Sequence, residues 1–348
     1  MSSRNIIVVG ASAGGVEALQ KLAGGLPTGL QAAVFVVLHQ LPTGKGLLPQ
    51  LLNRAGPLPA RDASDGELIE NGRIYTAPPD RHLLLENNRC RVVRGPRENF
   101  SRPAVDPLFR SAAQEFGRRV VGVILSGTLN DGTGGLWAIK QRGGVAVVQI
   151  PGEAAYAGMP QSAVDNVEVD YVLPLTEIAP QLLRLIHEPA TYNAPRREDR
   201  NTMSDAPASE FEVLPEIVTR NQTEQRNGLR HGQTSLFSCP ECGGVLWQAD
   251  ADGLTQFRCH VGHAYTGQAL ADGQSENVER SLWYAVRTLA DRGLLLRQLA
   301  HIARERGDTE SAVGFDRDSA TADAHKAVLQ QIVEGRSVQL SPNLTNYD

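Results

Sequence analysis

The chain has 348 residues, of which 41% are hydrophobic, and its formal net charge is −5. This length exceeds what a single hydrophobic core usually serves, so we expect two domains. The acidic balance excludes the basic surface that nucleic-acid binding requires. No apolar stretch approaches the roughly 20 residues of a membrane span, and the N-terminus lacks the layout of a signal peptide. We therefore expect a cytoplasmic protein that neither binds nucleic acid nor inserts into a membrane.

Short apolar runs alternate with helical patterns in the first half of the chain. This alternation predicts an α/β fold, a doubly wound and mainly parallel sheet in a three-layer α/β/α arrangement. Residues 65–85 differ, because glycines and prolines separate short β-prone pieces such as Arg73–Thr76, and we expect an antiparallel excursion there. The predicted buried strands are Ile6–Val9, Ala33–Leu38, Val120–Leu125 and Val145–Val148.

Composition divides the chain into three parts. Residues 1–187 contain the strand and helix patterns. Residues 188–232 are rich in Pro, Asn, Arg, Ser, Glu and Gln, which is typical of a flexible linker. Residues 233–348 contain three of the four cysteines and end in helical patterns, so they predict a small zinc-binding and helical region.

The sharpest local feature is the glycine-rich turn Gly10–Gly15, which places Ser12 between the first strand and a helix. A dinucleotide loop is disfavoured, because Ser12 replaces the second glycine of G-x-G-x-x-G and no acidic residue ends the next strand. Two interpretations remain open. Ser12 could simply cap the helix, or it could be a nucleophile exposed on a sharp strand–helix turn beside free backbone N–H groups.

A nucleophilic serine needs a base and an acid that orients the base. His39 follows the second predicted strand, and Asp131 lies just past the strand Val120–Leu125. Taken singly, a histidine is more often a packed residue, and Asn-Asp-Gly is more often a turn. Taken together, Ser12, His39 and Asp131 all fall at the carboxyl ends of strands in one sheet, as a convergent catalytic triad requires.

Six motifs follow one another in the first half of the chain. They are GASAGG at 10–15, HQLPTG at 39–44, DGELIENGRIYTAPPDRH at 65–82, SRPAVDPLF at 101–109, GVILSGTLNDG at 122–132 and AGMP at 157–160. With them, residues 5–187 resemble the catalytic domain of the chemotaxis protein-glutamate methylesterases, the CheB type. The resemblance implies that Ser12 is the nucleophile, His39 the base and Asp131 the orienting acid of a serine hydrolase.

The implied reaction removes methyl esters from glutamate residues of methyl-accepting chemotaxis receptors, and some relatives also deamidate glutamine. The implied oxyanion donors are the backbone of Ser12 and Ala13 and N–H groups near Thr128. The family usually has Met-Gly where this chain has Thr128-Leu129, so the shape of this loop is expected to differ. Arg102 is a candidate residue of the cleft or of the layer supporting it, with a solvated surface charge as the alternative.

The implied partners are the cytoplasmic helices of the receptors, with a cognate receptor methyltransferase or a separate response regulator as further candidates. Well-known family members place a phosphorylatable receiver domain before the esterase, whereas here the esterase strand starts at Asn5, so we expect no receiver domain within this chain. The alternative function is a catalytically weak adaptor or binding protein built on the esterase fold.

The cysteines near the C-terminal end have metal-ligand spacing. Cys239 and Cys242 form a C-x2-C pair, and Cys259 and His263 follow as C-x3-H, which predicts a tetrahedral zinc site. His260 is the alternative fourth ligand, and unpaired thiols or a redox pair are the competing interpretations. Four protein ligands leave no open position, so we expect structural zinc far from the chemistry, in a module whose small core contains Trp247, Phe257 and Tyr265.

Overall fold

The structure is a computed structural model that describes residues 3–44, 46–188, 233–251 and 254–334. It divides into two compact units, Met1–Leu270 and Ala271–Asp348. Apart from Glu188, the predicted linker at 188–232 lies outside the described residues. Among the residues that are described, no helix combines the length and the apolar character that a bilayer crossing requires.

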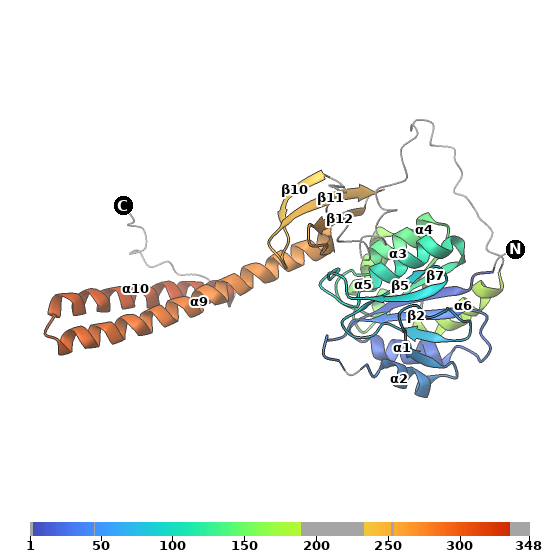
Figure 1. Cartoon of the computed structure of the whole chain (residues 1–348), viewed down its shortest axis with the longest axis horizontal. Helices are drawn as coiled ribbons and strands as arrows, with labels where there is room; N and C mark the ends of the chain where they lie inside the picture. Colours follow the sequence, from blue (N-terminus) through green and yellow to red (C-terminus); the bar gives the residue numbers. More distant parts are fainter. Residues whose placement is uncertain (1–2, 45, 189–232, 252–253, 335–348) are drawn as a thin grey trace. The chain divides into compact units, whose positions relative to one another are not determined.

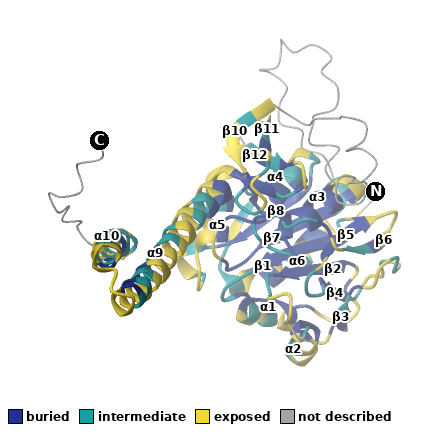
Figure 2. Cartoon of the chain, turned by 60° about the vertical axis from the view of Figure 1, so that its left-hand side comes forward, coloured by how far each residue is buried: buried dark blue, intermediate teal, exposed yellow. Residues whose placement is uncertain are grey.

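A seven-stranded, wholly parallel sheet forms the centre of the first unit, in the order β3-β4-β2-β1-β7-β8-β9. Its central strands are buried along their whole length because helices cover both faces (Figure 2). The predicted doubly wound α/β fold is confirmed. The strands are β1 (Ile6–Ala11), β2 (Ala33–Leu38), β3 (Ala60–Asp62), β4 (Ile74–Thr76), β7 (Val120–Ile124), β8 (Val145–Gln149) and β9 (Tyr171–Leu173).

In the described part of the chain, helices cover both faces of this sheet (Figure 1). Each set contributes apolar side chains to one of two large core clusters, so the sheet is sealed on both sides. One face carries α1 (Gly15–Gly24), α2 (Leu48–Ala55) and α6 (Leu175–His187), and the other carries α3 (Val105–Phe116), α4 (Thr133–Gln141) and α5 (Gly158–Asn166). Single 3-10 turns at Gly117–Arg119 and Pro151–Glu153 complete the connections.

The segment 65–85 departs from the expectation in one respect. Its piece Ile74–Thr76 is strand β4, which pairs in parallel with β2 and β3 and so belongs to the main sheet. The antiparallel excursion comes directly afterwards, as the hairpin of β5 (His82–Glu86) and β6 (Arg89–Val93). Strand β4 has only three residues, and its sequence pattern does not distinguish parallel from antiparallel pairing. Its direction is determined by the strands beside it.

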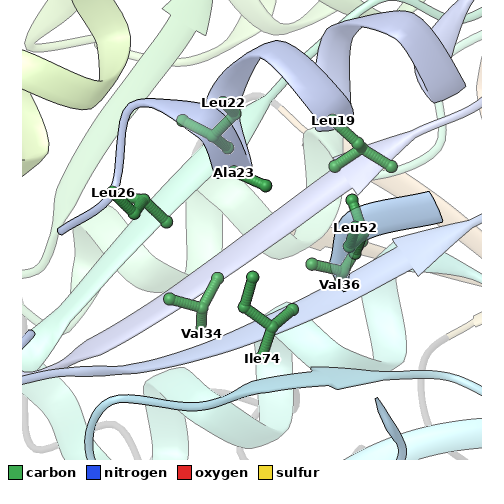
Figure 3. Close-up of a pocket in the computed structure, with 8 residues that line it drawn as sticks. All are labelled: Leu19, Leu22, Ala23, Leu26, Val34, Val36, Leu52 and Ile74. Carbon is green, nitrogen blue, oxygen red and sulfur yellow. The ribbon is translucent and has the colours of Figure 1, made fainter. Parts of the chain in front are cut away.

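A small cavity lies in the core on the α1 and α2 side of the sheet (Figure 3). Only aliphatic side chains line it, so it offers no polar group to a substrate and is a gap in the packing rather than a candidate site. The lining residues are Leu19, Leu22, Ala23, Leu26, Val34, Val36, Leu52 and Ile74.

Three of the cysteines belong to a four-stranded antiparallel sheet and its loops. The order of this sheet is β10 (Gln233–Ser238), β11 (Val245–Ala251), β12 (Leu254–Cys259) and β13 (Ala264–Thr266). Cys239 and Cys242 follow β10, and Cys259 ends β12. The part of the chain around this sheet, residues 233–270, is called the cysteine module. The expectation for its core is correct for Phe257 and Tyr265 but wrong for Trp247, because its neighbour Leu246 is the buried one. Adjacent residues of a strand point to opposite faces, so only one of the pair can enter the core.

The described part of the second unit, which ends at residue 334, consists of long helices. Helix α9 (Gly267–Glu305) enters it, and α10 (Thr309–Val333) follows after a short connection. Asp308 caps α10 by accepting a hydrogen bond from the Ser311 amide. Arg297 of α9 binds Asp323 of α10 at 2.7 Å, so the two helices of this unit run side by side (Figure 1).

Candidate active site

The turn that carries Ser12 is held by two backbone hydrogen bonds. The Ser12 amide donates to the Ser126 carbonyl after β7 at 2.9 Å, and the Gly15 amide donates to the Ser12 carbonyl at 2.8 Å. Gly14 has a φ of 69°, and a Cβ there would lie 2.6 Å from the Cβ of Ala155. This position therefore requires glycine for both its backbone angle and its surroundings.

His39 and Asp131 form a direct pair at the same edge of the sheet. The His39 amide donates to the Ala11 carbonyl at 3.1 Å, which places His39 beside the end of β1, one residue before Ser12. Its Nε2 donates to Oδ2 of Asp131 at 2.6 Å. Because Nε2 is engaged, Nδ1 is the ring nitrogen that can serve Ser12. The structure thus joins His39 to Asp131 and places Ser12 at the adjoining strand end.

The carboxylate of Asp131 is buried and receives five hydrogen bonds. Burial alone would raise the pKa of Asp131, but the hydrogen bond and charge of His39, together with the other donors, hold it below its ordinary value. Asp131 is therefore a fixed anion that orients the His39 ring. The donors are His39 and the Val105 amide (2.6 Å) to Oδ2, and Asn99 (2.9 Å), the Asp106 amide (3.2 Å) and the Gly132 amide (3.0 Å) to Oδ1.

Two supporting residues were missed in the sequence reasoning. Asn99 donates from one Nδ2 to Asp131 and to Oδ2 of Asp106, at 2.9 and 3.0 Å. Burial, followed by the charge of Asp131, raises the pKa of Asp106 to about 7. Asp106 lies in the motif SRPAVDPLF, which could have indicated that it belongs to the site. The residues around Asn99 contain no such motif, so the sequence does not distinguish Asn99 from an ordinary turn residue.

The oxyanion expectation needs one correction. The Ser12 amide is occupied by the Ser126 carbonyl, so it cannot also hold a developing oxyanion. Within the part of the chain that the structure describes, the amides of Ala13 and Thr128 have no hydrogen-bond acceptor. At Gly127, the residue before Thr128, a Cβ would lie 2.9 Å from the Ser12 Cβ and 2.1 Å from Sδ of Met159, so the loop after β7 approaches Ser12 closely.

Arg102 is held by the protein rather than solvated. Its Nε and Nη2 donate to Oδ1 of Asp80 at 2.8 and 2.5 Å, and Nη1 donates to the Gly95 carbonyl at 2.7 Å. Its side chain is 15% exposed. Arg102 therefore anchors the chain ahead of α3, whose N-terminal amides bind Asp131.

Comparisons with known proteins identify the family of this domain. The sequence model of the CheB methylesterase family matches residues 7–182, just over half of the chain. The chain belongs to the CheB methylesterase family. The matched segment, residues 7–182, is its esterase domain. The crystal structure of the Thermotoga maritima CheB methylesterase catalytic domain superposes with a TM-score of 0.51 and 32% identity, covering 53% of this chain and all of that one.

Curated relatives give the same result at the level of sequence. A Leptospira interrogans protein is 40% identical over 180 residues, covering 51% of this chain and 93% of its own. Protein-glutamate methylesterase/protein-glutamine glutaminase of Salmonella typhi is 36% identical over 190 residues, covering 53% of this chain and 54% of that protein. The chain thus spans nearly all of the first relative but about half the length of the second.

The residues predicted to bind metal form one cluster beside the esterase domain. The ligand atoms of Cys239, Cys242, Cys259 and His263 all lie within 4.8 Å of one another. His263 Nδ1 is 3.6 Å from Sγ of Cys239 and 3.5 Å from Sγ of Cys259. The geometry therefore selects His263 over the exposed His260, and the four groups could hold a metal ion.

The expectation that this cluster lies far from the chemistry is wrong. Strand β13, which begins directly after His263, contacts the two chain segments that border the Asp131 carboxylate. The Asn99 amide donates to the Ala264 carbonyl at 2.9 Å, and Asn130 donates to Oγ1 of Thr266 at 2.5 Å. Spacing along the chain could not reveal this, because 136 residues separate Asn130 from Thr266.

Proposed function

We propose that the esterase domain hydrolyses glutamate methyl esters on methyl-accepting chemotaxis receptors, with Ser12, His39 and Asp131 as its catalytic triad. The observation that carries the proposal is the 2.6 Å hydrogen bond from His39 to a buried, ionised Asp131 at the strand end next to Ser12. Membership of the CheB methylesterase family supports a protein-glutamate methylesterase, a carboxylic ester hydrolase, acting on methylated chemotaxis receptors.

The chemistry divides into two steps. Ser12 Oγ attacks the ester carbonyl, His39 Nδ1 takes the serine proton, and the same proton leaves with the methoxide oxygen as methanol. Water then attacks the acyl-serine, gives its proton to His39, and releases the glutamate carboxylate while Ser12 recovers its hydrogen. The free amides of Ala13 and Thr128 would stabilise the oxyanion in both steps. With a glutamine substrate, ammonia replaces methanol as the leaving group.

The surface around the turn suits a helical protein substrate. Three large apolar side chains are exposed on the loops that surround the site: Leu41 at 75%, Leu129 at 43% and Tyr156 at 49%. Exposed apolar side chains grouped at one edge are typical of a protein-binding surface. The proposed substrates are the cytoplasmic helices of the receptors, and with them we propose a cytoplasmic location for the chain. A cognate receptor methyltransferase, which would form the ester, and a separate response regulator are the further proposed partners.

We also propose that the cluster in the cysteine module binds one structural zinc ion. Zinc–sulfur bonds of about 2.3 Å in a tetrahedron put neighbouring ligands about 3.5–3.8 Å apart. The Cys242 and Cys259 sulfurs are 3.6 Å apart, and His263 Nδ1 has the same spacing to two sulfurs. The other nitrogen of His263 lies 3.4 Å from a Glu241 oxygen, the arrangement in which a carboxylate orients a metal-binding histidine.

Methanol release from a methylated receptor tests the function directly. The wild-type chain should release methanol, and Ser12→Ala should not, although both are folded by circular dichroism. Equal release by the two proteins would contradict the serine mechanism.

Metal analysis of protein purified without added zinc tests the proposed zinc site. One zinc per chain is expected, and a stoichiometry near zero would contradict the proposal.

A further inference from the structure

The segment Arg97–Ser101 connects the catalytic carboxylate to the cysteine module. On one side, Asn99 Nδ2 donates to Oδ1 of Asp131 at 2.9 Å. On the other side, three successive residues of β13 hold the same segment. Ala264 accepts the Asn99 amide at 2.9 Å, the Tyr265 ring lies 5.0 Å from the Phe100 ring, and the Thr266 amide donates to Oδ1 of Asn99 at 3.2 Å.

The Thr266 amide decides which way the Asn99 side chain faces. An asparagine side chain has one accepting end and one donating end. Because the Thr266 N–H binds the oxygen, the nitrogen must point toward Asp131 and Asp106. In the reverse orientation, the Asn99 oxygen would face the carboxyl oxygens of Asp131 and Asp106. The Asn99 NH2 group would then face the Thr266 N–H, and neither group could accept a hydrogen bond. The cysteine module thereby fixes a donor of the catalytic aspartate.

Thr266 also acts on the second segment that borders the carboxylate. Its Oγ1 accepts from Asn130, the residue before Asp131, at 2.5 Å. Asn99, Asn130 and Thr266 are each no more than 5% exposed, so water does not substitute readily for these contacts. One strand of the module therefore restrains both the hydrogen-bond partner and the backbone neighbour of Asp131.

The same strand is attached to the metal cluster. β13 starts at Ala264, directly after His263, and the Cys259 amide donates to the His263 carbonyl at 2.9 Å. The Tyr265 hydroxyl lies 3.2 Å from Sγ of Cys239. A further charged contact ties the module to the esterase domain, where buried Glu98 binds Arg110 at 2.6 Å and Arg258 of β12 at 3.4 Å.

We propose that the cysteine module is a positioning element of the esterase. Asn99 and Thr266 are positioning residues that hold Asp131, and through it His39, in the productive geometry, so esterase turnover depends on the metal state of the module. This inference rests on the proposed function, both for the triad and for the zinc site. It assigns the module a role in the reaction itself, beyond stabilising its own fold.

The test compares matched substitutions in the full chain, with kcat and KM for methanol release measured separately. Asn99→Ala should lower kcat about 10- to 100-fold, the cost of a small misplacement of a catalytic group, and leave KM almost unchanged. Thr266→Val should lower kcat about 2- to 10-fold, because it removes the hydrogen bond from Asn130 at nearly constant shape, together with the one from the Ala269 amide in α9. Asn130→Ala removes the Asn130 bond alone, from the esterase side, and serves if Thr266→Val does not fold.

Two control variants delete the same groups elsewhere. Asn166→Ala removes an amide on the surface of α5 that binds the Ser162 carbonyl, and Thr255→Val removes a hydroxyl of β12 that binds Asp250. Both should keep the wild-type kcat. Circular dichroism and thermal unfolding of every variant verify that the fold is retained.

Metal removal completes the test. Chelation of the wild-type chain should lower kcat at least as far as Asn99→Ala does, and added zinc should restore it. In Asn99→Ala, chelation should lower kcat no further than Thr266→Val does in the wild-type chain, because only the contact between Thr266 and Asn130 remains to be lost. Turnover that survives Ser12→Ala would contradict the proposed function and this inference with it. Turnover lost in Ser12→Ala but kept in full by Asn99→Ala, Thr266→Val and the chelated chain would overturn the positioning role alone.

Discussion

The esterase domain and the cysteine module differ in what stabilises them. The esterase domain buries two large apolar clusters, one on each face of a parallel sheet. The cysteine module has one small cluster, and two of its buried side chains, Cys239 and Cys259, are candidate metal ligands. A domain of this size buries too little apolar surface to be stable alone, and the proposed zinc ion would supply the missing stability. We therefore expect metal removal to unfold the cysteine module and to leave the fold of the esterase domain intact.

Chelation should produce the largest difference between the two regions. Structural zinc contributes about 10 kcal/mol or more to the folding of a small module, so its removal should unfold the cysteine module and leave its three thiols free to react. Cys90 should stay protected, because it is buried in the esterase domain and burial raises the pKa of its thiol to about 12. Thiol titration with and without chelator checks this, and rapid reaction of all four thiols would show that the two regions unfold together.

Ser12→Ala should have the next largest effect, and on chemistry alone. Removing the nucleophile of a serine triad lowers turnover by about 10³-fold or more. The turn itself should survive, because Ser12 is held through its backbone rather than through its hydroxyl. Methanol release and the melting temperature are the two measurements. A large fall in melting temperature would mean that the side chain is structural instead.

Glu98→Ala tests the boundary between the regions. Glu98 is 2% exposed, and the charges of Arg110 and then Arg258 overcome its burial and hold its pKa below the ordinary value. Its removal leaves Arg110 buried without its partner, which should cost about 3–5 kcal/mol in the free energy of unfolding. The control is Glu70→Ala at the exposed pair with Arg73, where less than about 1 kcal/mol is expected. Equal costs in urea unfolding would contradict the buried network.

Asp106→Asn should give the smallest effect, visible as a dependence on pH. Asp106 has a raised pKa of about 7 in the folded chain, so it keeps its proton while the unfolded chain loses it near 4. The wild type therefore loses stability as pH rises from about 4 to about 7, by roughly 2–4 kcal/mol, and Asp106→Asn lacks this loss. Unfolding free energies of the two proteins across this window provide the check. Parallel curves would show that Asp106 is ionised throughout.

The sequence by itself was sufficient for the α/β class and for the group of three cysteines and one histidine that could hold a metal ion, and it predicted that Ser12, His39 and Asp131 lie at one edge of the sheet. Each follows from a short-range signal: continuous apolar runs, the C-x2-C and C-x3-H spacing, and polar residues at strand ends. The sequence also predicted the glycine-rich turn. The structure explains its glycine at position 14, because a φ of 69° and the nearby Ala155 side chain leave no room for a Cβ.

Only the tertiary structure decided what supports the triad. Asn99 and Thr266 are separated by 167 residues, and neither has a local pattern that marks it as part of an active site. Their roles arise because β13 lies against the segment 97–101, a contact between parts of the chain that periodicity and spacing describe separately. The same reason made the metal cluster seem remote from the chemistry. Two residues that are far apart along the chain can lie in contact in space, because the folded chain brings the cysteine module against the segments that hold Asp131.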